Sequence, residues 1–239
     1  MRLKRPRWVW ARNLCLAGMW LCYYAGLPFM IFSLAAACYY TAPVWMALLS
    51  RILLDERIGC VKLIAIFTAF VGVMIAVDPL GSELSLAVLL PLAAALFYAL
   101  TAIITWSRCA EEAPLALAFN LNIILVIAGS VGTAMLVLFA PADADGFILS
   151  AWPSLGTAEW LLIVFLALLH PVIEMAVAKA YQLAPSTIIG VFDNAYLPFA
   201  AFWAFVLMFE IPTWSEASGM TLIAAAGILI VREGHRRSR

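Results

Sequence analysis

Long apolar stretches separated by short polar segments run through all 239 residues of the chain. A membrane-spanning helix needs about 20 mostly apolar residues, and charged residues, proline and glycine divide the sequence into segments of that length. We predict spanning helices at residues 11–32, 35–54, 61–78, 86–106, 115–140, 160–181, 186–209 and 215–232. The pattern therefore predicts an all-α fold, a polytopic membrane helix bundle with about 8 transmembrane helices.

The composition supports this interpretation. Hydrophobic residues make up 66% of the chain and charged residues only 12%, whereas a soluble domain has about 25% charged residues. No soluble core could enclose so large an apolar fraction, so a soluble globular protein is excluded. We expect the lipid bilayer to surround the chain, and no basic patch suggests nucleic acid as a partner.

The distribution of the 14 Lys and Arg residues tests the helix bounds independently. When the predicted helices alternate in direction, all of these residues fall on one side of the membrane. The connections on the other side, residues 78–85, 141–159 and 210–216, contain neither Lys nor Arg. Because positive charge collects on the cytoplasmic side, we expect a multi-pass protein of the cell (inner) membrane with cytoplasmic N- and C-termini.

A shift of the sequence by 155 residues exposes an internal repeat. Each copy has a helix with an early proline, an acidic turn, and a helix with a glycine near its end; the matching pairs are Pro43 with Pro198, Asp55 with Glu210, and Gly72 with Gly227. The acidic turn is cytoplasmic in the first copy and external in the second, so the two copies are inverted. We predict two units, residues 1–80 with three helices and residues 81–239 with five. Inverted repeats are typical of secondary transporters that work by alternating access.

Residues 33–77 and 184–232 carry a resemblance to a known family. The first stretch, SLAAACYYTAPVWMALLSRILLDERIGCVKLIAIFTAFVGVMIAV, has a small and aromatic helix with a proline, an acidic turn around Glu56, and a last helix with a Gly-Val run. These features resemble the end of an EamA-type repeat of the drug/metabolite transporter superfamily, and the second stretch resembles the matching end of the second repeat. Where the family usually has Gly before the acidic Glu, this chain has Asp55.

The resemblance implies a secondary transporter of a small organic metabolite or drug, with no enzymatic activity and no cofactor, and coupling to protons is an open alternative. Members of this family usually have ten helices, five per repeat, and the first unit here has three. The chain is then either a fragment or a short form that needs a partner to supply the missing helices. A homodimer and a non-transporting membrane subunit also remain open.

Ionisable side chains inside a membrane are candidate sites, because each costs roughly 2.5 to 3.5 kcal/mol at a helix centre. His170 and Glu174 are four residues apart and share one face of the sixth predicted helix. Asp193 and Asn194 lie in the seventh predicted helix. The carboxylates of Glu174 and Asp193 are therefore candidates to flank one cavity that binds substrate or a proton. The alternative is a buried pair that only fixes helix packing, either His170 with Glu174 or Lys179 with Asp193.

The first unit offers aromatic side chains instead of charges. Tyrosine and tryptophan at mid-membrane can stack on a flat ligand or hold a cation, and they serve equally well as packing residues; the candidates are Tyr24, Tyr39, Tyr40 and Trp45. We expect an aromatic or amine-bearing solute. His170 with Glu174 also resembles part of a metal site, as in an intramembrane metalloprotease, but the sequence lacks HExxH, so no metal is expected.

Overall fold

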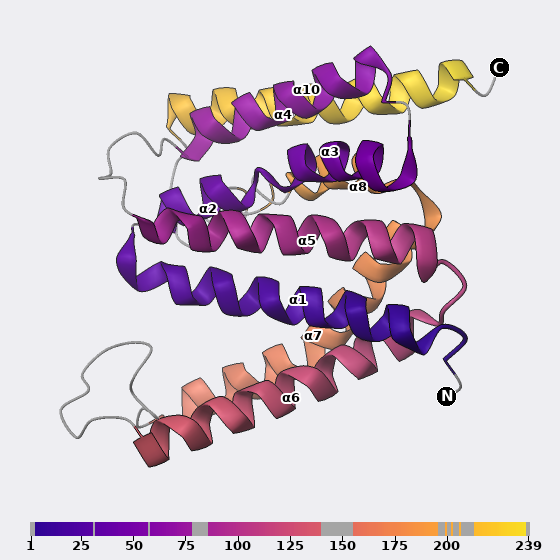
Figure 1. Ribbon diagram of the computed structural model, residues 1–239. Coiled ribbons are helices and arrows are strands. Elements are labelled where there is room, and N and C mark those ends of the chain that lie inside the picture. The colour runs from indigo at the N-terminus through magenta and orange to yellow at the C-terminus, as the bar shows by residue number, and fades with distance from the viewer. Residues whose placement is uncertain are drawn as a thin grey trace.

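The computed structural model describes residues 3–30, 32–56, 58–77, 86–139, 155–195 and 213–237, with the single positions 199, 202 and 206. Every regular element in these ranges is a helix (Figure 1), which confirms the all-α fold class. The elements are α1 (Pro6–Gly26), η1 (Leu27–Phe29), α2 (Phe32–Tyr39), α3 (Ala42–Leu54), α4 (Cys60–Val77), η3 (Leu86–Val88), α5 (Leu89–Arg108), α6 (Pro114–Phe139), α7 (Thr157–Leu183), α8 (Ser186–Asp193) and α10 (Trp214–Arg237).

Most predicted spans coincide with observed helices to within a few residues. Among the described residues, four stretches are long and apolar enough to cross a membrane by themselves: Leu34–Leu54, Leu86–Arg108, Pro114–Leu138 and Thr157–Leu183. The predicted span 186–209 begins as α8. Most of its second half, with Pro198, lies outside the described residues, as do Glu210, the predicted connection at 78–85 and residues 141–154 of the predicted connection at 141–159.

The span predicted as one helix at 35–54 is two helices, α2 and α3, with a break at Tyr40 and Thr41. Pro43 lies in the first turn of α3, where its missing N–H is tolerated, whereas in a continuous helix it would remove a hydrogen bond. The Thr41 hydroxyl instead donates to the Cys38 carbonyl over 2.7 Å. The proline therefore divides this span rather than merely bending it.

Asp55 ends α3 in a left-handed conformation, with φ of 51°. Glycine is the common residue at such a helix end, and Asp is one of the few others that adopt it at modest cost. The substitution of Asp for the glycine usual in the family therefore keeps the same turn. The next residue, Glu56, forms an ion pair of 3.1 Å with Lys62, which joins this acidic turn to the start of α4.

The helices lie roughly side by side in one bundle, with α4 and α10 along one edge and α6 and α7 along the other (Figure 1). A Cβ added to Gly72 of α4 would lie 2.7 Å from the Gly219 carbonyl oxygen of α10, so the two backbones touch at this crossing. Gly227 is different, because a Cβ there would meet Phe192 at an ordinary 3.6 Å. The first residues of α1 and the last of α10 lie at the same end of the bundle (Figure 1).

Candidate functional site

An open pocket of about 520 Å³ lies between α1, α6 and α7. Trp20 and Tyr24, one turn apart on α1, stack with ring centroids 5.6 Å apart and planes 14° apart. His170 of α7 faces this pair, with its ring centroid 6.3 Å from that of Trp20. Small residues of α6, Ala128 and Gly129, contribute to the opposite wall. The volume is within the range of about 300 to 1,000 Å³ found for small-molecule sites.

The stacked pair is one end of a continuous series of six rings, which we call the aromatic row: Trp20, Tyr24, Tyr23, Tyr39, Tyr98 and Tyr181. Successive ring centroids are 5.5 to 6.1 Å apart, from Tyr23–Tyr39 to Tyr98–Tyr181. Such spacings are typical of favourable aromatic contacts. The row crosses from α1 through α2 and α5 to α7, so it connects the pocket with the interior of the bundle.

Asp193 of α8 lies at the inner end of the aromatic row. Its carboxylate accepts a hydrogen bond from the Tyr98 hydroxyl over 2.8 Å and a second one from the Tyr181 hydroxyl. Two donors to one oxygen hold this carboxylate in a fixed position, because hydrogen bonds to a charged group are stronger than neutral ones. The next residue, Asn194, is 1% exposed, and its amide has no hydrogen-bond partner among the described residues.

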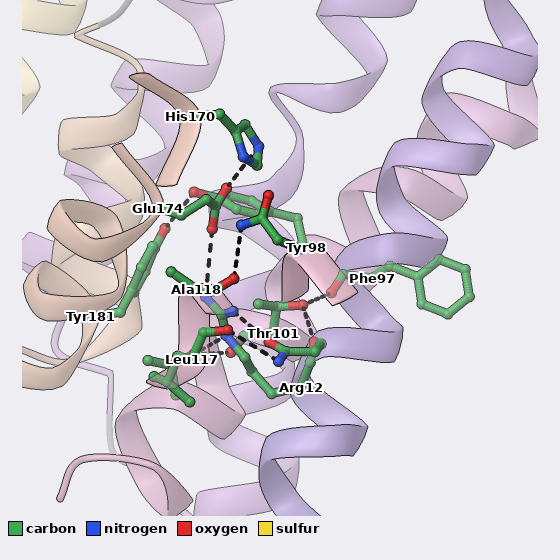
Figure 2. A network of polar contacts seen from close by, with 12 residues as sticks. Arg12, Phe97, Tyr98, Thr101, Leu117, Ala118, His170, Glu174 and Tyr181 are labelled. Carbon is green, nitrogen blue, oxygen red and sulfur yellow. Dashed lines mark hydrogen bonds and ion pairs between the residues drawn. The ribbon is translucent and has the colours of Figure 1, made fainter. Parts of the chain in front are cut away.

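A second polar cluster surrounds Glu174 of α7, near His170 (Figure 2). The Arg12 guanidinium lies 3.9 Å from Glu174 Oε2, and His170 Nε2 lies 3.9 Å from Oε1. Arg12 is only 2% exposed; its Nη1 donates to Asn13 Oδ1 over 2.6 Å and its Nε to Thr105 Oγ1 over 3.3 Å. A buried guanidinium facing a buried carboxylate compensates its charge.

Helical periodicity explains why these two clusters occur together. Tyr98, Thr101 and Thr105 follow at intervals of three and four along α5, so they share one face. Tyr98 contacts Asp193. Thr101 contacts the Arg12 carbonyl, and Thr105 contacts the Arg12 guanidinium. On α7, Glu174 and Tyr181 are seven residues apart and also share a face. One polar face of each helix therefore serves both clusters.

The structure brings together most of the residues that the sequence singled out. Tyr24 and His170 line the pocket, Tyr39 belongs to the aromatic row, and Tyr40 packs against Tyr39 at 5.8 Å. Trp45 instead packs against the core residues around Met46. Of the two packing pairs considered, His170 with Glu174 occurs, with Nε2 and Oε1 3.9 Å apart. Lys179 does not pair with Asp193, because Lys179 is exposed and Asp193 accepts hydrogen bonds from tyrosines.

Sequence reasoning missed three residues of this region. Arg12 was assigned to the basic cytoplasmic segment, but it lies inside the bundle because α1 begins at Pro6, five residues before the predicted start. The signal that could have found it is an arginine followed by Asn13 at the start of an apolar run. Tyr98 and Trp20 were missed as site residues because nothing local distinguishes them from packing aromatics. No group of three metal-binding side chains occurs among the described residues.

The fold and the sequence of this chain are similar to those of known proteins. A solved crystal structure shares the fold, with a TM-score of 0.75 over 96% of this chain and 78% of that one, at 19% identity. A helix bundle with several spans that are apolar enough to cross a bilayer defines the chain as a multi-pass membrane protein. Residues 4–77 match the EamA-like transporter family.

Three curated relatives carry the name riboflavin transporter. The one from Vibrio cholerae serotype O1 is 25% identical over 83% of this chain and 62% of the relative. The one from Brucella anthropi is 24% identical over 83% and 67%, and the one from Rhizobium johnstonii 28% identical over 90% and 67%. The chain thus spans 62 to 67% of the length of these relatives. These matches agree with the resemblance to EamA-type transporters that the sequence indicated, and the family match itself extends over residues 4–77.

Proposed function

We propose that this protein takes part in moving a small aromatic solute of the flavin class across the membrane by alternating access. The observation that carries the proposal is the pocket beside the stacked rings of Trp20 and Tyr24. A flat ring system binds well against aromatic faces, and relatives of this chain are named for riboflavin. The same relatives favour a transporter over a metalloprotease.

The aromatic row supports a path for such a solute. It leads from the pocket to Asp193, so a planar molecule meets ring after ring instead of apolar walls alone. The carboxylates Asp193 and Glu174 are the groups in this region that we propose for proton coupling, because a buried carboxylate can exchange a proton as its surroundings change. We further propose that the predicted inverted repeat provides the two halves that move against each other.

The arrangement of helices supports that inverted repeat. Three parts of the first unit run antiparallel to their counterparts 155 residues later (Figure 1): α1 to α7, α4 to α10, and the α2–α3 pair to α8. The second unit also contains α5 and α6, for which the described first unit has no equivalents. We propose that a homodimer or a partner supplies helices to the exposed apolar first half of α7, and that the end shared by α1 and α10 is cytoplasmic, following the positive-inside rule.

Transport in liposomes tests this function. Protein reconstituted in liposomes is expected to take up riboflavin in the presence of a pH gradient, and Trp20→Ala with Tyr24→Ala is expected to reduce the initial rate at least tenfold, since base–aromatic stacking is worth about 1 to 3 kcal/mol per ring. Trp214→Ala is the matched control, because Trp214 is 93% exposed at the start of α10. Uptake equal to empty liposomes, together with no flavin binding in detergent, would overturn the proposal.

A further inference from the structure

Glu174 has more hydrogen-bonding capacity than its surroundings use. The residue is 8% exposed, and its Oε2 is buried with no hydrogen-bond partner among the described residues. Its distances to Arg12 and His170 are both 3.9 Å, longer than a hydrogen bond. A buried carboxylate normally accepts several hydrogen bonds. The unmet capacity therefore indicates a place where a donor from a ligand fits.

The neighbouring charge limits which donor is suitable. Arg12 already compensates the charge of Glu174, and both side chains are buried. A cationic amine that approached Glu174 would also meet the guanidinium, and like charges repel strongly in a medium of low polarity. A hydroxyl carries no charge and can both donate to the carboxylate and accept from Arg12. The pair consequently favours a neutral hydroxyl over the amine that the sequence suggested.

His170 connects this pair to the pocket. Its side chain is 32% exposed and lines the pocket beside Trp20, and Glu174 follows one helical turn later on the same face of α7. A solute stacked on Trp20 and Tyr24 can therefore direct a substituent past His170 toward Glu174. The stacked rings and His170, which leads on to Glu174, therefore border the same pocket.

We propose that Glu174, positioned by Arg12 and reached past His170, is a hydrogen-bonding subsite for a neutral, hydroxyl-bearing side chain of the aromatic solute. The inference rests on the proposed function and specifies which part of the solute the chain selects. The ring system binds to the stacked rings, and the hydroxylated chain of a molecule such as riboflavin binds at Glu174. A flavin without that chain then binds the stacked rings and leaves Glu174 unsatisfied.

Two flavins with the same ring system test the subsite on the unmodified protein. Riboflavin carries the hydroxylated chain, and lumiflavin has a methyl group in its place. Binding to purified protein is followed by quenching of flavin fluorescence, which reports ring stacking in both cases. A site built to hydrogen-bond a hydroxyl discriminates against the analogue that lacks it, so we expect riboflavin to bind at least tenfold more tightly than lumiflavin.

Variants then assign the preference to Glu174. Glu174→Gln is expected to reduce the riboflavin preference to about threefold or less while lumiflavin affinity stays unchanged, because a hydrogen bond to a charged acceptor is replaced by a weaker neutral one. Arg12→Gln with Glu174→Gln removes both charges together, so no buried charge is left unpaired if the single variant fails to fold. The control is Glu111→Gln, which removes an exposed carboxylate paired only with Lys4 on the surface.

The outcomes separate the subsite from the proposed function. Binding of neither flavin by the unmodified protein contradicts the proposed function itself. Equal affinity for the two flavins, or a preference that persists in the double variant, overturns the subsite while flavin binding stands. A preference lost in the Glu174 variants and kept in Glu111→Gln supports the subsite.

Discussion

At the scale of single residues, the site depends on side chains whose partners come from distant parts of the chain. Asp193 is held by Tyr98 of α5 and Tyr181 of α7, and Glu174 by Arg12 of α1. Tyr181 is 12 residues before Asp193, whereas Tyr98 is 95 residues away from Asp193 and Arg12 is on the first helix of the chain. Local pattern identified the costly ionisable groups and the His170–Glu174 pair on one helix face, but not the partners from other helices, because those are set by helix packing.

Removal of one donor to Asp193 is expected to slow transport. Tyr181→Phe keeps the ring in the aromatic row and deletes the hydroxyl that donates to Asp193. A hydrogen bond to a charged group is worth about 1.5 to 3 kcal/mol, so we expect riboflavin uptake in liposomes to fall about tenfold or more. The comparison is Thr221→Val, which removes an exposed hydroxyl bonded only to its own helix. An uptake rate equal to the unmodified protein in Tyr181→Phe would show that this donor is dispensable.

Thiol reactivity tests the placement of Cys109, directly after α5. Burial raises the pKa of the Cys109 thiol to about 11, although the nearby Arg12 acts in the opposite direction. The thiolate is the reactive form, so at pH 8 the thiol is almost entirely protonated and the side chain, at 0% exposure, is expected to resist maleimide. Cys60 is exposed and is expected to react under the same conditions. Mass spectrometry of labelled peptides from folded protein measures both; rapid modification of Cys109 at pH 8 would contradict its buried position.

At the scale of elements, hydropathy and charge predicted the positions of most helices because each apolar stretch matches one membrane crossing. The break between α2 and α3 was not predicted, since the chain there stays apolar and only Pro43 marks it. The start of α1 was placed too late, because Trp8 and Trp10 lie among arginines that suggested a loop. The contact of Gly72 with Gly219 was also not predictable, since the repeat identifies Gly227 only as the equivalent position and says nothing about contacts in space.

The close approach of α4 and α10 leads to a prediction for two glycines that the repeat treats as equivalent. Gly72→Ala places a methyl group 2.7 Å from the Gly219 carbonyl oxygen, and such overpacking costs about 1 to 3 kcal/mol. Gly227→Ala meets Phe192 at 3.6 Å and is expected to be nearly neutral. Thermal unfolding in detergent, followed by circular dichroism, should show a lower midpoint for Gly72→Ala alone. Equal midpoints for the two variants would mean that the crossing is looser than described.

At the scale of the whole molecule, hydropathy predicted the helix bundle and the family resemblance agrees with the relatives, whereas the proposed substrate preference rests on the arrangement of side chains. The sequence suggested an aromatic or amine-bearing solute because it counted two carboxylates and several tyrosines. The structure places Arg12 beside Glu174, which removes the argument for an amine there and leaves the aromatic part. Predicting this would have required the packing of α1 against α7.

The contact between the backbones of Gly72 and Gly219 limits how the bundle can change shape. Two helices that touch without intervening side chains cannot slide past each other without clashes, so we expect α4 and α10 to move together. We then expect the proposed alternating access to bend the bundle elsewhere, at the break at Tyr40 and Thr41 between α2 and α3. Because Tyr39 is directly before this hinge and within the aromatic row, its bending would alter the solute path itself rather than a distant gate.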